Sequence, residues 1–385
     1  MSALEPSFSV PFSFPVVFTR DLWRTDRPLF AGVVSRLEPR RQHRLLVAID
    51  EGLAAATPTL IADVTAYVRA HSDQLALVAP PVLVPGGEVS KNDLTQTLRL
   101  LELINTHGID RQSFIVAVGG GAALDTISFA AATGHRGIRV IRIPSTVLAQ
   151  ADSGVAVKNG VNMFGKKNFV GTFAPPFAVI NDIALIETLS RRDRIAGVSE
   201  IIKVALLKDA SLFESVEMLA AQLATGDLAA LETVIRPSLE WHMRHICTTG
   251  DPFELGSARP LDFGHWAAHK LESITANRIR HGEAVAIGMA LDLQYAVLAG
   301  FLPAPIAARI SRVITATGLP TWDDAVLHRN ASGALSLIEG LREFREHLGG
   351  ELHITMLRDI QSPFEVTEMD LTLVTQAITD LAPVH

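Results

Sequence analysis

Short apolar runs alternate with amphipathic segments over the first half of the chain, and this alternation most constrains the fold. Five apolar runs are bounded by Gly, Pro or Asp, as buried strands usually are: 44–50, 76–84, 113–120, 138–144 and 177–182. The segments 57–72 and 94–108 between them carry helical periodicity. Strands that alternate with helices predict a largely parallel sheet covered by helices.

The two ends of this pattern predict an edge element and a domain boundary. The proline-containing segment SVPFSFPVVF (9–18) is expected to add a hairpin at a sheet edge. Beyond residue 185 the patterns are helical, from RIAGVSEIIKVALLKD (194–209) to APIAARISRVITATG (304–318). We therefore predict an α/β domain over 1–185, followed by a mainly helical domain over 186–385.

Composition limits the classes of protein that the chain can belong to. Its 385 residues are 48% hydrophobic and 19% charged, which allows a sizeable core and argues against disorder. The net charge of −7 argues against a nucleic-acid binder, so an anionic substrate needs a local group of Lys and Arg. A single cysteine, Cys247, excludes an internal disulfide and a cysteine zinc site. With neither a signal-peptide pattern nor a membrane-span pattern, the protein is expected to be cytoplasmic.

A glycine-rich turn follows one predicted strand. VGGGAALD (118–125) ends that strand and opens a helix, where glycines let a phosphate approach the backbone and the helix N-terminus favours negative charge. A plain strand-to-helix turn remains the alternative. Asp50 ends another strand, and it suits either ribose hydroxyls or a helix cap.

The segment 150–168, QADSGVAVKNGVNMFGKKN, concentrates cations and amides among glycines. It contains Asp152, Lys158, Asn162 and Lys167. In an acidic protein this pattern favours capture of a phosphate or a polyol, and a solvated loop is the alternative.

Helical histidines and a helical glutamate suggest a metal site. His265 and His269 are four residues apart and share one helical face, which fits either a metal ligand with a helper or two structural histidines. Glu200 and Lys203 lie in an apolar helical run, where a glutamate needs a partner unless the pair is at the surface. With His281 at the start of another apolar helix, Glu200 and His265 make a two-histidine, one-carboxylate set. Such a set is typical of an open catalytic zinc site.

In their order along the chain, these motifs resemble 3-dehydroquinate synthase and the related sugar phosphate cyclases. The resemblance runs from about Asp50 to Met289 and includes GEVSK, GGGAALD, EIIK, GHWAAH and HGEAVAIGM. It implies an α/β domain that binds NAD, a helical domain that binds Zn2+ or Co2+, and a homodimer that acts on a sugar phosphate.

The resemblance also implies roles for individual residues. Those that look like NAD contacts are Asp50, Glu88, Lys91, Gly120, Gly121, Asp125, Ser145, Thr146 and Lys167. The zinc ligands would be Glu200, His265 and His281. The residues that resemble substrate contacts are Asp152, Lys158, Asn162, Lys203 and His269, with Arg136 reaching a substrate phosphate from the neighbouring subunit.

One segment departs from the pattern of dehydroquinate synthases, RxxLNxGHTxGHA. Here it reads ARPLDFGHWAAHK, so the expected Arg falls on Ala258, with Arg259 displaced by one, and the expected Asn is Asp262. A substrate carboxylate would lose a bidentate partner and face a like charge.

The departure favours a cyclase whose substrate has no carboxylate, such as sedoheptulose 7-phosphate, giving a valiolone-type cyclitol. The predicted reaction is a lyase reaction that eliminates phosphate and then closes a carbocycle by intramolecular aldol addition. Three alternatives remain: a divergent 3-dehydroquinate synthase of the shikimate pathway, a metal-dependent polyol or alcohol dehydrogenase, and an inactive sugar-phosphate-binding protein.

Overall fold

The computed structural model describes residues 4–164, 166–248, 251–253, 261–347 and 352–383. The chain divides into two compact units. Unit 1 comprises Met1–Ile143 and Val157–Asp182, and unit 2 comprises Pro144–Ala156 and Ile183–His385. The predicted boundary near residue 185 differs from this division in one segment, because Pro144–Ala156 packs with the helices of unit 2.

Unit 1 is built on a parallel sheet with the strand order β1-β9-β6-β5-β2-β3, and β4 also pairs with β2. Its strands are β1 (Val16–Thr19), β2 (His43–Asp50), β3 (Leu75–Leu77), β4 (Val82–Val84), β5 (Phe114–Gly119), β6 (Arg139–Pro144) and β9 (Ala178–Asp182). The pairs of β2 with β3, β4 and β5 are parallel, as are those of β9 with β1 and β6. The near-continuous apolar runs in β2 and β5 are buried, as parallel strands covered on both faces require.

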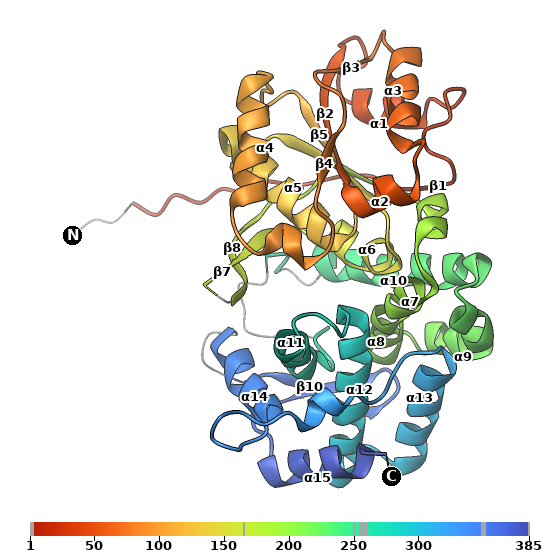
Figure 1. Ribbon diagram of the computed structural model, residues 1–385, viewed down its shortest axis with the longest axis vertical. Helices are drawn as coiled ribbons and strands as arrows, with labels where there is room; N and C mark the ends of the chain where they lie inside the picture. The colour runs from red at the N-terminus through yellow and green to blue at the C-terminus, as the bar shows by residue number, and fades with distance from the viewer. Residues whose placement is uncertain (1–3, 165, 249–250, 254–260, 348–351, 384–385) are drawn as a thin grey trace. The chain divides into compact units, whose positions relative to one another are not determined.

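Helices cover this sheet (Figure 1). They are α1 (Leu29–Ser35), α2 (Glu51–Ala56), α3 (Leu60–Ala70), α4 (Thr95–Thr106) and α5 (Gly121–Thr133), with short 3₁₀ turns η1 (Glu88–Lys91) and η2 (Gly134–Arg136). The alternation of strand and helix confirms the predicted α/β class with a parallel sheet.

Two local predictions in unit 1 were incomplete or wrong. The segment 9–18 does not form an edge hairpin: its last residues enter β1, which pairs in parallel with β9 at the sheet edge. The glycine-rich segment expected as a loop contributes instead to an antiparallel hairpin of β7 (Lys158–Met163) and β8 (Lys166–Phe173). Gly160 and Gly171 face each other in this hairpin, and a Cβ on either would lie within 2.8 Å of a backbone oxygen of the other strand.

Unit 2 is mainly helical, as predicted. Its helices are α6 (Val147–Ala151), α7 (Arg191–Ala196), α8 (Val198–Lys208), α9 (Ala210–Thr225), α10 (Leu228–Thr248), α11 (His265–Ile274), α12 (His281–Leu298), α13 (Ala304–Ala316), α14 (Ser336–His347) and α15 (Leu371–Leu381). The 3₁₀ turns are η3 (Ser153–Val155), η4 (Ile183–Thr188) and η5 (Asp324–Leu327). A small antiparallel hairpin of β10 (Ile354–Asp359) with β11 (Ser362–Val366) was not predicted from the sequence.

Two glycines allow α11 and α12 to approach closely. Gly264 precedes α11 with φ +79°, and a Cβ there would lie 2.7 Å from the backbone nitrogen of Met289. A Cβ on Gly288 of α12 would lie 2.0 Å from the carbonyl oxygen of Gly264. Larger residues at these positions would push the two helices apart, so the glycines set how closely α11 and α12 approach each other.

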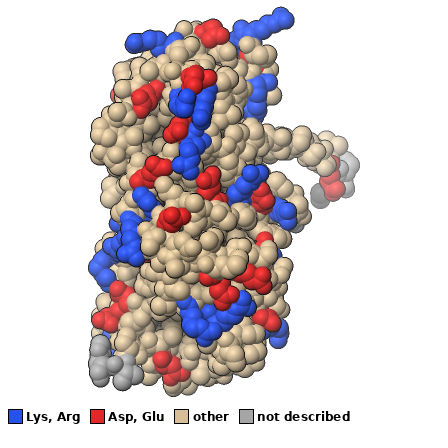
Figure 2. Space-filling view, turned by 90° about the vertical axis from the view of Figure 1, so that its right-hand side faces the viewer, with Lys and Arg blue, Asp and Glu red and all other residues tan. Residues whose placement is uncertain are grey.

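Acidic and basic side chains are interspersed on the face drawn in Figure 2, without a continuous basic field among its coloured residues. No helix in the described ranges combines the length and the apolarity that a membrane span needs.

Candidate active site

Three helices of unit 2, α8, α11 and α12, are labelled in Figure 1. They bring Glu200, His265 and His281 together. Glu200 lies in the first turn of α8, and His265 and His281 are the first residues of α11 and α12. Their ligand atoms lie within 4.8 Å of one another, and we call these three residues the ligand cluster. The sequence supplied the residue types, and the fold makes residues that are far apart along the chain converge.

The distances within the ligand cluster suit a metal ion. Oε1 of Glu200 lies 3.1 Å from Nε2 of His281 and 3.6 Å from Nε2 of His265. Ligands that bind Zn2+ tetrahedrally at 2.0–2.1 Å are about 3.4 Å apart, so both separations are close to what a shared ion needs.

Both imidazoles are oriented by groups behind them. Nδ1 of His265 lies 3.1 Å from the carbonyl oxygen of Phe263, and Nδ1 of His281 lies 3.2 Å from Oε2 of the buried Glu272. Since these oxygens only accept, each Nδ1 carries its proton and each Nε2 is turned to the ligand cluster. This is how metal-binding histidines are usually held, so the residues present fit a divalent cation.

Charge also favours a cation here. Burial opposes ionisation of Glu200, but Lys203 and the two histidines outweigh it and hold the pKa of this carboxyl well below its usual value. Burial lowers the pKa of His281, but Glu272 and Glu200 outweigh it and raise the pKa to about 10. Two buried carboxylates therefore stabilise positive charge between them, whether on a proton or on a metal ion.

Lys203 is the buried cation beside Glu200. Its side chain is 3% exposed and forms an ion pair with Glu200, one helical turn away. Burial lowers the pKa of Lys203, but the charges of Glu200, Asp152 and Asp262 outweigh it and raise the pKa. The predicted alternative, an ordinary surface ion pair, is therefore wrong.

Asp292 of α12 holds the start of α11. Its Oδ2 accepts from the backbone nitrogen of Gly264 at 2.8 Å, and its Oδ1 accepts from the indole nitrogen of Trp266 at 2.7 Å. These two residues flank His265 in sequence, so the carboxyl holds the backbone before that ligand and the side chain after it. Burial raises the pKa of Asp292 to about 7, although both hydrogen bonds lower it.

Three predicted substrate contacts lie in unit 2 near the ligand cluster. The His269 ring is centred 5.7 Å from that of His265 and 6.3 Å from that of His281. Asp262 begins the turn before α11, and its carbonyl oxygen accepts from the backbone nitrogen of His265 at 3.1 Å. Asp152 follows α6, and its Oδ1 lies 3.2 Å from Nδ1 of His242 on α10.

Three residues of this site were not predicted from the sequence: His242, Glu272 and Asp292. A signal for Glu272 was present, because it follows His265 by seven residues and therefore shares its helical face. His242 and Asp292 carry no comparable local signal. Ala258 and Arg259, which bear on the substrate prediction, lie outside the described residues.

Six predicted or neighbouring polar residues of unit 1 gather where the β7–β8 hairpin meets η1 and α5, and we call them the hairpin group: Glu88, Lys91, Asp125, Asn162, Lys167 and Asn168. Lys91 donates to Asp125 and to Asn168, each at 2.5 Å. Asn162 donates to Glu88 at 3.2 Å, and Lys167 lies 3.8 Å from Glu88.

Several predicted cofactor contacts have structural roles. Asp50 caps α2 by accepting from the backbone nitrogens of Gly52 and Leu53 at 2.8 and 3.2 Å, so the helix-cap alternative is confirmed. Gly119 allows β5 to end beside Asp50, because a Cβ there would lie 2.9 Å from the Cβ of Asp50. Thr146 caps α6 by accepting from the backbone nitrogen of Ala149.

The remaining predicted residues lie in a turn, in the interior or at the surface. Gly120 and Gly121 form the junction of β5 and α5, as the glycine-turn pattern predicts. Ser145 is buried in unit 2, whereas Lys158 and Arg136 of unit 1 are exposed. Arg136 has φ +63° in the tight turn after α5.

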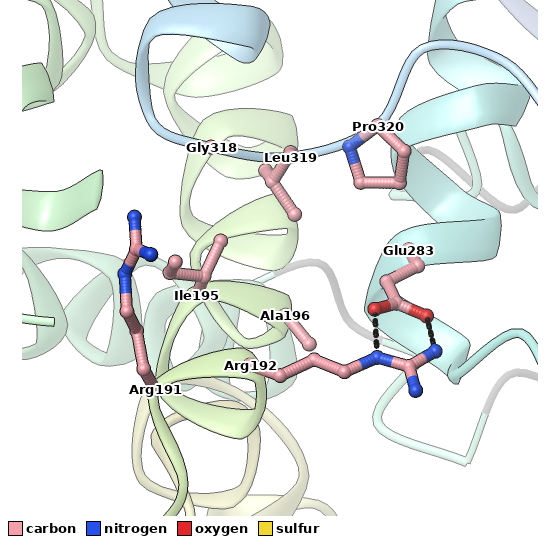
Figure 3. A pocket seen from close by; sticks show the side chains of 8 residues that line it. All are labelled: Arg191, Arg192, Ile195, Ala196, Glu283, Gly318, Leu319 and Pro320. Carbon is pink, nitrogen blue, oxygen red and sulfur yellow. Dashed lines mark hydrogen bonds and ion pairs between the residues drawn. The ribbon is translucent and has the colours of Figure 1, made fainter. Parts of the chain in front are cut away.

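A separate cavity of about 330 Å³ lies in unit 2 between α7, α12 and the segment after α13 (Figure 3). The Arg192 guanidinium on its wall makes two bonds to Glu283, at 2.5 and 2.6 Å, and Arg191 donates to the carbonyl of Ala224. No predicted site residue lines this cavity, so it is not the candidate active site.

Comparison with known protein families supports the resemblance. Residues 81–196 match the model of the 3-dehydroquinate synthase N-terminal domain, and residues 197–339 match that of the C-terminal domain. The protein therefore belongs to the 3-dehydroquinate synthase family.

Two kinds of relative are similar in sequence. A 2-epi-5-epi-valiolone synthase of Streptomyces glaucescens is 35% identical over 298 residues, which cover 75% of each chain. A 3-dehydroquinate synthase of Cereibacter sphaeroides is 33% identical over 346 residues, which cover 88% of this chain and 89% of that one.

A solved structure is similar over nearly the whole chain. It is the 2-epi-5-epi-valiolone synthase of Streptomyces hygroscopicus subsp. jinggangensis, with NAD+ and Zn2+ bound. The TM-score is 0.85 at 25% identity, and the match covers 98% of this chain and 99% of that one.

Proposed function

We propose that this protein is a sugar phosphate cyclase that depends on NAD and Zn2+. The proposed substrate is sedoheptulose 7-phosphate, which loses phosphate and closes by intramolecular aldol addition to a valiolone-type cyclitol. The observation that carries this proposal is the ligand cluster, in which Glu200 and His265 are buried and His281 is partly buried. Lys203 lies beside this cluster, and Asp262 lies at the turn into α11.

The chain offers residues for both cofactors. Glu200, His265 and His281 would hold the metal ion. The β5–α5 glycine turn, Ser145, Thr146 and four members of the hairpin group would contact NAD, and these four are Glu88, Lys91, Asp125 and Lys167. When bound, the metal supplies Lewis acidity to a substrate oxygen, and NAD+ accepts a hydride and later returns it. The valiolone synthase from Streptomyces hygroscopicus, which has both cofactors bound, supports this assignment.

The chain's own residues would position the substrate and move its protons. The buried ammonium of Lys203 interacts with the carboxylates of Asp152 and Asp262, so it can orient substrate hydroxyls between them. His269 lies beside both histidines of the ligand cluster, where it can exchange a proton with the substrate or its leaving phosphate. Lys158 and Asn162 would bind that phosphate, together with Arg136 from a neighbouring subunit.

Asp262 is the residue that would select the substrate. An ionised carboxylate only accepts hydrogen bonds, so it binds hydroxyl groups and repels a substrate carboxylate. Sedoheptulose 7-phosphate offers hydroxyls there, whereas the seven-carbon substrate of 3-dehydroquinate synthase carries a carboxylate. The two valiolone synthases among the relatives support this choice.

A phosphate-release assay tests the proposal. Protein loaded with Zn2+ and NAD+ is given either sedoheptulose 7-phosphate or the seven-carbon carboxylate sugar phosphate of the shikimate route. We expect release from the first alone, with no net NADH. The variant His265→Ala, which removes one member of the ligand cluster, should release no phosphate. His107→Ala, which changes a histidine outside the ligand cluster, is its matched control.

The other outcomes point to specific alternatives. Release from the carboxylate substrate alone would make the protein a divergent 3-dehydroquinate synthase, which the long match to the Cereibacter sphaeroides enzyme favours. Net NADH without phosphate release would indicate a polyol dehydrogenase. Substrate binding without either product would indicate a binding protein.

A further inference from the structure

One face of α10 supports the turn that carries Asp152. Ser238 and His242 are four residues apart, so they share that face. The hydroxyl of Ser238 donates to the carbonyl of Ala151 at 3.3 Å, and Nδ1 of His242 lies 3.2 Å from the carboxylate of Asp152. Successive turns of one helix therefore hold two consecutive residues of the segment that joins α6 to η3.

The turn itself has little freedom to move. A Cβ on Gly154 would lie 2.5 Å from the carbonyl oxygen of Ala149 and 2.6 Å from Cγ of Pro144, so the chain folds tightly back on its own preceding segment. With the backbone fixed in this way, the direction of the Asp152 carboxylate depends mainly on what the side chain contacts.

The chemistry of His242 suits an orienting role. Its side chain is 7% exposed, whereas that of Asp152 is 26% exposed. Nε2 of His242 is buried and has no hydrogen-bond partner among the described residues. A charged ring would leave a buried N–H unpaired there, whereas a neutral ring leaves only a lone pair. Burial lowers the pKa of His242, which favours a neutral ring. Nδ1 is the ring nitrogen that lies beside the Asp152 carboxylate, so the Nδ1–H tautomer would turn its proton toward that oxygen.

We infer that His242 is a positioning residue for the reaction, and that it holds one carboxylate oxygen of Asp152 so that the other can accept hydrogen bonds from hydroxyls of a polyol phosphate. This inference rests on the proposed function, in which Asp152 contacts the substrate. Lys203 interacts electrostatically with both residues, which places the pair beside the ligand cluster.

Two substitutions of His242 separate orientation from packing. His242→Asn keeps an N–H donor where Nδ1–H lies, and His242→Leu keeps most of the volume without a donor. With sedoheptulose 7-phosphate, we expect kcat/KM to fall about 10-fold to 100-fold in the leucine variant. The Asp152 carboxylate would no longer be held in one direction, so it would orient the substrate hydroxyls less well. The asparagine variant should recover most of this loss, while thermal stability and zinc content match the wild type in both.

A double substitution tests whether the effect passes through Asp152. In an Asp152→Asn background, His242→Leu should cost far less than it does alone, because the carboxylate that it orients is gone. Additive losses would overturn the inference. So would a leucine variant with wild-type kcat/KM, or an asparagine variant as impaired as the leucine variant.

A spectroscopic readout keeps this test separate from the proposed function. In 15N-histidine protein, His242 should show the Nδ1–H neutral tautomer, and Asp152→Asn should shift its resonances. If the protein turns over no sugar phosphate but shows this tautomer and this shift, the proposed function is refuted and the Asp152–His242 contact still stands. An Nε2–H tautomer in an active enzyme would refute the inference alone.

Discussion

The ligand cluster of unit 2 and the hairpin group of unit 1 are both predicted binding sites, but they are held in different ways. Glu200 is 0% exposed, whereas the His281 side chain is 30% exposed. Each histidine of the ligand cluster nevertheless has its second ring nitrogen against a carbonyl or a buried carboxylate. In the hairpin group, Lys91 is buried, but Lys167 and Glu88 are about one-third exposed and lie 3.8 Å apart.

This difference shows which site the fold prepares in advance. Buried charges are tolerated only when they are paired, so the geometry of the ligand cluster is fixed when unit 2 folds. Exposed pairs contribute little to stability and can exchange partners easily. We therefore expect substitutions in the ligand cluster to affect activity strongly, and those in the hairpin group to affect cofactor affinity modestly.

The largest expected effect comes from removing a metal ligand. His265→Ala should abolish zinc binding and lower the rate of phosphate release by on the order of 10³-fold or more, because several kcal/mol of charge stabilisation are lost. Zinc content and phosphate release measure this, and circular dichroism checks that the variant folds. Activity that survives both this substitution and chelation would refute the metal assignment.

A smaller effect should follow from changing the carboxylate behind His281. Glu272→Gln weakens the hold on Nδ1, so we expect metal affinity to fall about 10-fold to 100-fold while the ligands remain. Competition with a chelator measures the affinity, and the visible spectrum of the Co2+-loaded protein reports on the geometry. Glu339→Gln, which changes a partly exposed carboxylate beside Lys270, is the control and should behave as wild type.

Asp292 should make stability depend on pH. Its pKa is about 7 in the folded protein and 3.8 ordinarily, so the folded state binds a proton that the unfolded chain releases. The stabilisation of the folded state by this bound proton is complete below about pH 4 and is lost as the pH rises to about 7. Asp292→Asn cannot lose a proton, so its deficit in the free energy of unfolding should be larger at pH 5 than at pH 8, by on the order of a few kcal/mol.

Denaturant titrations of wild type and variant at both pH values measure this change. Asp380→Asn, which changes an exposed carboxylate that accepts from Gln294, is the control. A deficit for Asp292→Asn that does not depend on pH would show that the buried carboxyl is ionised at both pH values.

The smallest expected effect lies in the hairpin group. Lys167→Gln should raise the Kd for NAD on the order of fivefold, with no change in thermal stability, because an exposed ion pair contributes at most about 1 kcal/mol. Lys166→Gln changes the neighbouring lysine, whose side chain points to the opposite face of the hairpin, and should leave the Kd unchanged. Equal effects of the two substitutions would reduce the role of Lys167 to general electrostatic attraction.

The sequence by itself determined the α/β class, the helical second half and the chemical types in the ligand cluster. These depend on local patterns: strand runs such as 44–50 and 113–120, the spacing of His265 and His269, and a glutamate among apolar residues at Glu200. The resemblance then supplied the order of motifs and the expected cofactors. Asp50 shows the limit of a local pattern, since the same residue suited a ribose contact and a helix cap.

Tertiary structure decided what no local pattern contains. Glu200, His265 and His281 meet because α11 and α12 pack closely through Gly264 and Gly288, and a contact of that kind depends on both helices at once. The β7–β8 hairpin was hidden because glycines and lysines obscure the alternation of a strand. The supporting roles of His242 and Asp292 likewise arise from packing between helices, because a buried polar group is defined by its partner rather than by its neighbours in sequence.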